Sequence, residues 1–178
     1  MQSDESMGEV AEVAEPHGTS LRLPSLLLGG QTQYMTVNDL QRFVDAQDDH
    51  GIFAIALDEL DAGRKRSHWV WFVLPQLAGL GTSDTARFFA LASIDEAAAY
   101  LVHPVLGPRL HETVSRLLAL SGVSAADVLG PVDAMKLRSS MTLFHRAEPD
   151  DPVFGAVLDR FFDGVPDEAT DLLLAKAR

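Results

Sequence analysis

Apolar residues recur at intervals of three and four along most of this chain, which is the period of an α-helix. Leu40, Phe43 and Val44 share one face of a predicted helix with the polar Gln47. Further segments begin at a capping serine, aspartate or proline and end at a glycine or before a proline. These signals predict a single helical turn from Ser124 to Leu129 and helices at about 53–62, 83–91, 93–102, 108–121, 131–147, 152–163 and 167–174. The last helix is expected to bury its three leucines, 172–174.

The segment 68–74 is ambiguous, because it is continuously apolar after His68. Its tryptophans and valines favour a β-strand, whereas its length fits a short buried helix equally well. No other segment has a strand pattern, so a strand here would lack a partner. We therefore expect a short helix that Ser67 caps and that stops before Pro75.

The composition also favours helices. The chain has 25 Leu and 22 Ala but only 3 Ile, and Leu and Ala are strong helix formers. Its 178 residues, of which 47% are hydrophobic, suit one globular domain. We expect an all-α fold, a compact single-domain array of about seven or eight helices with a disordered N-terminal tail.

Residues 1–34 differ from the rest of the chain. They contain five acidic residues and one basic residue, and they show no sustained helical period. This pattern predicts an acidic flexible tail, 1–34, followed by a single helical domain, 35–178. The alternative is a short helix that docks Leu21, Leu26 and Leu27 on the core. The acidic start lacks the basic segment with which secretory signals begin.

The overall charge limits the choice of partners. Lys and Arg number 14 and Asp and Glu number 26, which gives a net charge of −12. Such a domain is a poor general binder of nucleic acid or anionic membranes. There is no Cys, and no two of the six His have the i, i+4 spacing of a helical metal site. We expect a cytoplasmic protein without metal, cofactor, nucleic-acid or membrane partner.

Three consecutive basic residues, 64–66, stand out in this acidic chain. They precede an expected helix start, where free backbone N–H groups and the helix dipole favour an anion. His68 is a candidate catalytic residue, because histidine changes its charge near neutral pH and this one lies beside cations. The candidate ligand-binding side chains of this segment are Arg64, Arg66, Ser67 and Trp69.

A structural role for the same segment is the alternative. The basic run would then form ion pairs with the nearby Asp58, Glu59 and Asp61, and the two tryptophans would belong to the core.

The segment 136–142 is a second candidate, because it combines two cations with three hydroxyls on one predicted helix. Gln47 is a third hint, since a buried amide on an apolar helix face needs a partner. Small polar residues inside an apolar helix alternatively allow close helix packing. The candidate ligand-binding residues of the second segment are Lys136, Arg138, Ser139 and Ser140.

Four longer motifs resemble those of a bacterial family of uncharacterised small proteins that is often mislabelled "calpastatin". The resemblance covers about 36–174 and implies a compact, mainly α-helical single domain, without an established activity. A weaker likeness to a helical family linked to ADP-ribose and N-glycoside chemistry lies around Ala46, Gln47 and 103–118. The four motifs of the first resemblance are 40–47, 63–81, 103–110 and 136–144.

These observations lead to two functional hypotheses. In the first, segments 64–69 and 136–142 converge on one pocket that binds a small anionic or nucleotide-like ligand, with hydrolysis as a further hypothesis. In the second, the domain is a non-enzymatic protein-interaction module with an exposed apolar patch. The position of the two basic segments in the fold distinguishes these hypotheses.

Overall fold

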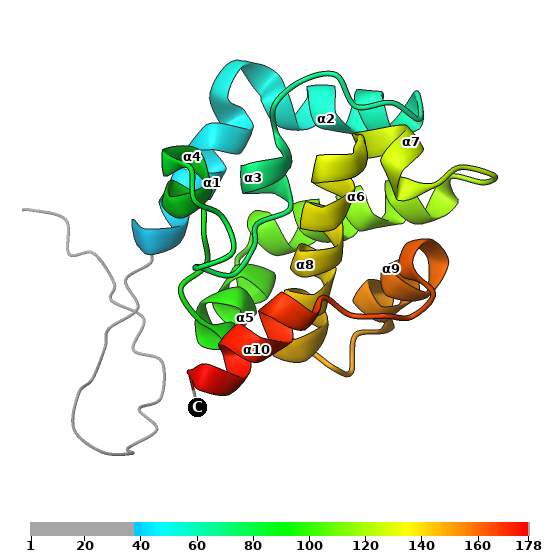
Figure 1. Ribbon diagram of the computed structural model, residues 1–178. Coiled ribbons are helices and arrows are strands. Elements are labelled where there is room, and N and C mark those ends of the chain that lie inside the picture. The colour runs from blue at the N-terminus through cyan, green and yellow to red at the C-terminus, as the bar shows by residue number, and fades with distance from the viewer. Residues whose placement is uncertain (1–37, 178) are drawn as a thin grey trace, which may run out of the picture. The chain divides into compact units, whose positions relative to one another are not determined.

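The computed structural model describes residues 38–177, which fold into helices joined by short loops (Figure 1). No β-strand occurs in this range, apart from an isolated parallel bridge between Leu77 and Leu91. The predicted all-α fold is therefore confirmed. The predicted tail at 1–34 lies outside the described residues.

The helices follow the predicted segments closely. They include a short helix at Val70–Val73, within the apolar segment for which a short helix was expected. The α-helices are α1 (Asn38–Asp48), α2 (Ile52–Asp61), α3 (Val70–Val73), α4 (Asp84–Phe88), α5 (Ile94–Val102), α6 (Leu106–Ala119), α7 (Ala125–Leu129), α8 (Pro131–Ala147), α9 (Pro152–Phe162) and α10 (Glu168–Lys176).

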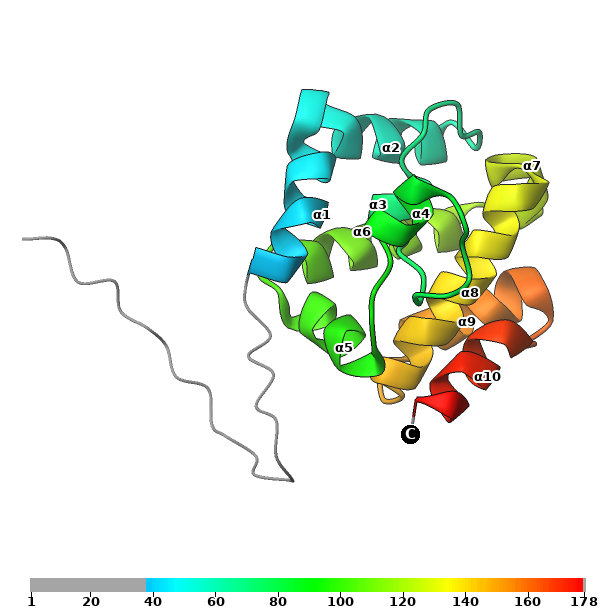
Figure 2. The ribbon, with the colours of Figure 1, turned by 60° about the vertical axis from the view of Figure 1, so that its left-hand side comes forward.

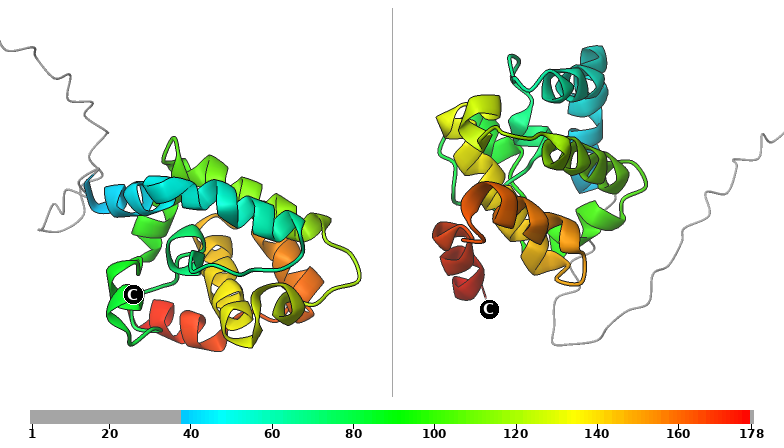
Figure 3. Two further views of the ribbon diagram at one scale, coloured as in Figure 1. Left: turned by 90° about the horizontal axis from the view of Figure 1, so that it is seen from above. Right: turned by 90° about the vertical axis from the view of Figure 1, so that its right-hand side faces the viewer.

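Helix α8 is the centre of the domain. It contacts α5, α7, α9 and α10, and Figure 1 shows it crossing the middle of the fold. Helices α1 and α2 lie on the opposite side of the domain from α9 and α10 (Figure 2). Helix α2 runs alongside α6, as the view from above shows (Figure 3). The helices thus enclose a single core.

A row of aromatic rings passes through that core. Phe43 of α1 meets Tyr100 of α5 edge-on at 5.3 Å between ring centroids. Tyr100 lies 5.5 Å from Phe144 of α8, and Phe144 lies 5.6 Å from Phe154 of α9. All four side chains are fully buried, and such pairs add to the stabilisation that burial alone provides. The row therefore joins four helices that are distant in sequence.

Several predicted helix boundaries are confirmed by their hydrogen bonds. The Ser93 hydroxyl accepts from the backbone N–H of Glu96, and Ser124 forms a complete capping box with Asp127. Gly63 has a φ of +65° just after α2, a conformation that favours glycine. Local sequence therefore determines where these helices begin and end.

Other local predictions were wrong. Ser67 does not cap α3, which begins after Trp69 without a side-chain cap. The predicted helix at 83–91 ends at Phe88, because the chain then extends so that Leu91 can pair with Leu77. Leu172 is 53% exposed although the pattern assigned it to the core. No helix within residues 38–177 is long and apolar enough to cross a membrane.

Candidate functional site

The loop between α2 and α3 carries the first basic segment, and its backbone is held at two points. The backbone N–H of Lys65 donates to the carbonyl of Val128 in α7 at 2.7 Å. The Glu59 carboxylate of α2 accepts from the backbone N–H groups of Arg66 and Ser67, both at 2.9 Å. These bonds link the loop to two separate helices, so its side chains project from a fixed backbone.

Glu59 also determines the role of Trp69. The Trp69 indole N–H donates to Glu59 Oε2 at 2.8 Å, and the Trp69 side chain is fully buried. Trp69 therefore has no exposed face for a ligand, contrary to the ligand-binding role expected of it. Burial acts to raise the pKa of Glu59, but the hydrogen bonds from Arg66, Trp69 and Ser67 outweigh it and lower that pKa.

Lys65 and Lys136 meet at one carboxylate. Lys65 Nζ lies 2.7 Å from Asp133 Oδ2, and Lys136 Nζ lies 2.8 Å from Asp133 Oδ1. Burial acts to raise the pKa of Asp133, but hydrogen bonds and charge from the two lysines lower it. The two candidate segments thus come together at these two lysines. The residue that joins them is an acid that was not among the predicted site residues.

The two lysines also pack on the two tryptophans. Lys136 Nζ lies 4.1 Å from the ring centroid of Trp71, and Lys65 Nζ lies 5.5 Å from that of Trp69. Such contacts are attractive because the aromatic face is electronegative. The ring of His68 lies 6.3 Å from that of Trp71. The two basic segments therefore meet at a cluster of aromatic rings and paired charges.

Arg64 and Arg66 remain outside this arrangement. Both are exposed, and neither guanidinium forms an ion pair or hydrogen bond with any residue in the range 38–177. Of the acids expected to neutralise them, Glu59 binds backbone N–H groups and Asp61 binds Arg116. His68 is also exposed, and no described residue holds its ring by a hydrogen bond. We call Arg64, Arg66, His68, Trp71 and Lys136 the basic–aromatic surface.

Arg138 does not converge on this surface. Its Nε donates to the carbonyl of Val165 at 2.9 Å and its Nη2 donates to the carbonyl of Pro166 at 3.1 Å. Positions 136 and 138 are two residues apart on α8, so their side chains leave the helix in directions about 160° apart. The expectation that both basic segments line one enclosed pocket is therefore not met.

The two serines of α8 that were predicted to bind a ligand are buried inside the domain. Ser139 is buried and donates to the Met135 carbonyl one turn earlier at 3.1 Å. Ser140 is completely buried in the core. Both positions agree with the packing alternative rather than with a polar cavity.

Gln47 belongs to a separate buried network. It is 1% exposed, and its Nε2 donates to the carbonyl of Phe72 at 2.7 Å and to the Tyr100 hydroxyl at 3.1 Å. Its Oε1 accepts from Arg109 at 3.3 Å. Burial strongly raises the pKa of Tyr100, so this phenol stays protonated. The partner that the sequence demanded for Gln47 is thus provided inside the protein.

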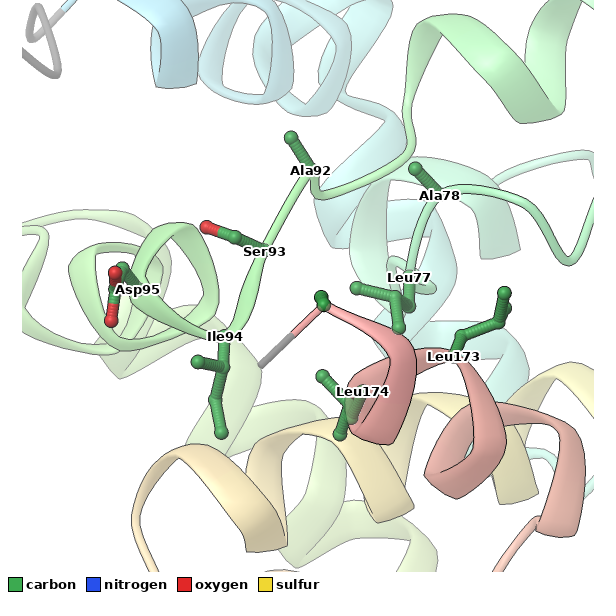
Figure 4. A pocket seen from close by; sticks show the side chains of 9 residues that line it. Leu77, Ala78, Ala92, Ser93, Ile94, Asp95, Leu173 and Leu174 are labelled. Carbon is green, nitrogen blue, oxygen red and sulfur yellow. The ribbon is translucent and has the colours of Figure 1, made fainter. Parts of the chain in front are cut away.

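A shallow hollow of about 230 Å³ lies elsewhere, between α10, the start of α5 and the loop after α3 (Figure 4). Its walls are mainly apolar, and none of the predicted ligand-binding residues lines it. No basic side chain contributes to it, so it offers nothing to an anion. Its lining residues are Leu77, Ala78, Ala92, Ser93, Ile94, Asp95, Leu173, Leu174 and Ala177.

No group of three or more His, Asp or Glu side chains in the described part of the chain is arranged to hold a metal ion. Asp133, the residue that joins the two basic segments, was not among the residues predicted for the site. The i, i+3 spacing of Asp133 and Lys136 was a usable local signal for that pair. Nothing in the sequence indicated the contact with Lys65.

A family model described as "Protein of unknown function (DUF1810)" matches residues 37–174. The chain belongs to this family. The match covers all four motifs that carried the first resemblance, so membership in an uncharacterised family is confirmed. No curated protein matches the chain.

One solved structure is closely similar. It is the crystal structure of the conserved hypothetical protein Rv1873 from Mycobacterium tuberculosis, with 47% sequence identity and a TM-score of 0.75. The match covers 77% of this chain and 96% of that chain. The family and this structure together identify the fold, and neither description names an activity.

Proposed function

We propose that this domain binds an anionic group, a phosphate or a carboxylate of a small ligand, at the basic–aromatic surface. The observation that carries the proposal is the pair of exposed guanidinium groups of Arg64 and Arg66. They have no acidic partner among residues 38–177, in a chain of net charge −12. A guanidinium is well suited to phosphate and carboxylate, because it presents several N–H donors in one plane.

The fixed backbone of the loop supports the proposal. Glu59 and Val128 hold the segment that carries both arginines, so less conformational entropy is lost when an anion is bound. Lys65 and Lys136 exceed the single charge of Asp133 and add a positive charge nearby. A charge-assisted hydrogen bond to a bound anion contributes about 1.5–3 kcal/mol.

The proposal concerns binding at an open surface and includes no reaction. A general acid or base is usually oriented by a second group. Among the described residues none is hydrogen-bonded to His68. His68 instead serves as a further donor to the bound anion when it is protonated.

Tryptophan fluorescence provides the test, because Trp71 belongs to this surface. Trp69, the other of the chain's two tryptophans, is buried and hydrogen-bonded to Glu59, which holds the loop. Inorganic pyrophosphate, ATP and ADP-ribose are titrated at low ionic strength. We expect at least one of them to change the emission of Trp71 and to raise the melting temperature. A ligand at 100 times its dissociation constant adds about 2.7 kcal/mol to the free energy of unfolding.

The variant Arg64→Ala/Arg66→Ala should weaken this binding at least tenfold and leave the melting temperature of the free protein unchanged. Arg87→Ala is the matched control, because Arg87 is an exposed arginine on α4 that pairs with Asp84. Unchanged binding in the double variant, or no response to any of the three anions, would contradict the proposal.

A further inference from the structure

Two large apolar side chains are exposed beside the basic–aromatic surface. Val132 is 66% exposed and Met135 is 70% exposed, and they lie three residues apart on one face of α8. Between them in the sequence comes Asp133, which joins α8 to the basic loop through Lys65. Lys136 follows Met135 and packs on Trp71. Because Lys65 lies between Arg64 and Arg66 in the chain, its contact with Asp133 brings the loop that carries both arginines up to this part of α8.

The same face extends toward the loop that precedes α10. Met135 leaves α8 between the directions of Lys136 and Arg138, as the helical period requires. Arg138 donates to the carbonyl of Val165, and the Val165 side chain is 50% exposed. We call Val132 and Met135 the apolar stripe. Lys136 borders the stripe on one side and Arg138 borders it on the other.

Positive charge is concentrated around this stripe. Five of the fourteen basic residues of the chain lie in the two short segments 64–66 and 136–138. Within these segments Lys65 and Lys136 share the single charge of Asp133, and Arg64 and Arg66 have no acidic partner in the described range. The surface that complements this region is therefore acidic and contains apolar side chains.

We propose that the apolar stripe and the basic–aromatic surface together bind an acidic peptide segment of a partner protein. Its carboxylates contact Arg64 and Arg66, and its apolar side chains cover Val132 and Met135. The inference rests on the proposed function, since it names the bearer of the anionic group. It adds a hydrophobic contribution that a free anion does not provide.

A nucleic acid fits the same surface less well. A continuous polyanion is repelled by the net charge of −12, and its backbone offers no apolar group for Met135. Bases bind single-strand sites by stacking on open aromatic faces, whereas Lys136 lies 4.1 Å over the ring of Trp71. An acidic peptide requires only a few cations and benefits from the exposed apolar groups.

Fluorescence anisotropy of labelled peptides tests the inference. The probe is a 14-residue peptide of Glu, Leu and Ser, and the control peptide has every Leu replaced by Ser. We expect the wild-type protein to bind the Leu-containing peptide at least tenfold more tightly than the control peptide. In Val132→Ser/Met135→Ser this preference should fall below twofold, while the affinity for pyrophosphate stays unchanged. Val102→Ser is the control, because Val102 is 83% exposed on α5.

The outcomes separate the two proposals. If pyrophosphate binds but both peptides bind equally, the inference is wrong and the proposed function stands. If neither the peptides nor the anions bind, both are wrong. Tighter binding of a 14-nucleotide thymidine oligomer than of the Leu-containing peptide would also overturn the inference. Should the double variant melt early, the isosteric Val132→Thr replaces it, with the same expected loss of preference.

Discussion

Around Gln47, polar groups are buried and paired, whereas around Arg66 charged groups are exposed and two of them have no described partner. The Gln47 amide uses both its donor and its acceptor within the protein, on Phe72, Tyr100 and Arg109. At the basic–aromatic surface, the acids and lysines pair with one another or with the backbone, and the arginines are left over.

Burial and pairing distinguish a structural polar group, such as Gln47, from a candidate binding group, such as Arg66. A buried polar group that loses its partner destabilises the fold, because its desolvation is no longer compensated. An exposed cation without a partner contributes little to the fold and is available to a ligand. The predictions below test this difference, from the largest expected effect on stability to the smallest.

Gln47→Leu should have the largest effect. It removes both hydrogen bonds that Nε2 donates and the one that Oε1 accepts, and it leaves the Tyr100 hydroxyl and the Phe72 carbonyl under-satisfied. We expect the free energy of unfolding to fall by about 3 kcal/mol in urea titrations. Gln41→Leu in the same helix is the control, since Gln41 is exposed. A loss no larger than the control's would mean that the network contributes nothing.

Glu59→Ala should come next, because it leaves the buried Trp69 indole N–H and two backbone N–H groups of the loop without their acceptor. We expect a loss of about 2 kcal/mol. The tryptophan emission should also shift to longer wavelength as water reaches Trp69. An unchanged spectrum and an unchanged stability would show that the loop is held by other contacts.

The third prediction concerns pH, and its sign follows from the lowered pKa of Glu59. A carboxyl whose pKa is lower in the folded than in the unfolded state adds stability above its unfolded pKa of about 4.5. That stability is lost as the pH falls through the folded pKa. Glu59→Gln should therefore cost about 1 kcal/mol at pH 7 and much less at pH 3. For Gln47→Leu the loss should be the same at both pH values, since the Gln47 amide has no titratable proton.

Arg64→Ala/Arg66→Ala should have the smallest effect on stability, within about 0.5 kcal/mol in either direction. The same variant should lose anion binding, which is measured by tryptophan fluorescence. A strong loss of stability in this variant would show that the arginines stabilise the fold, as Gln47 does. It would contradict the distinction between structural and binding groups.

The fold was largely predictable, because helix boundaries depend on local signals. Each helix end is set by residues next to it in the sequence. Examples are the capping serines, the proline at the start of α8 and the glycines after α2 and α9. Leu172 was the clearest failure of the apolar pattern. Three consecutive leucines on a helix cannot all face inward at about 100° per residue.

The candidate site was predictable only in part. The unusual basic run at 64–66 is visible in the sequence, and its two arginines are exposed in the structure. That this run marks the functional site stays a prediction. The role of Trp69 was not predictable, because its burial depends on Glu59 and on the helices packed around it. The separation of Lys136 from Arg138 was predictable, because side chains two residues apart on a helix point in directions about 160° apart. The groups that each of them contacts were not, since Trp71 and Val165 are distant in sequence.

The all-α class, most helix ends, the membership in an uncharacterised family and the presence of a basic segment in an acidic chain follow from the sequence. All of these depend on residues close together or on composition. Which charges are neutralised and which stay free depends instead on how the helices pack. The contact of Lys65 with Asp133 and the use of Glu59 by the backbone arise from packing between distant segments. Ion pairing requires atoms within a few ångströms, and local sequence signals do not specify such distances across the fold.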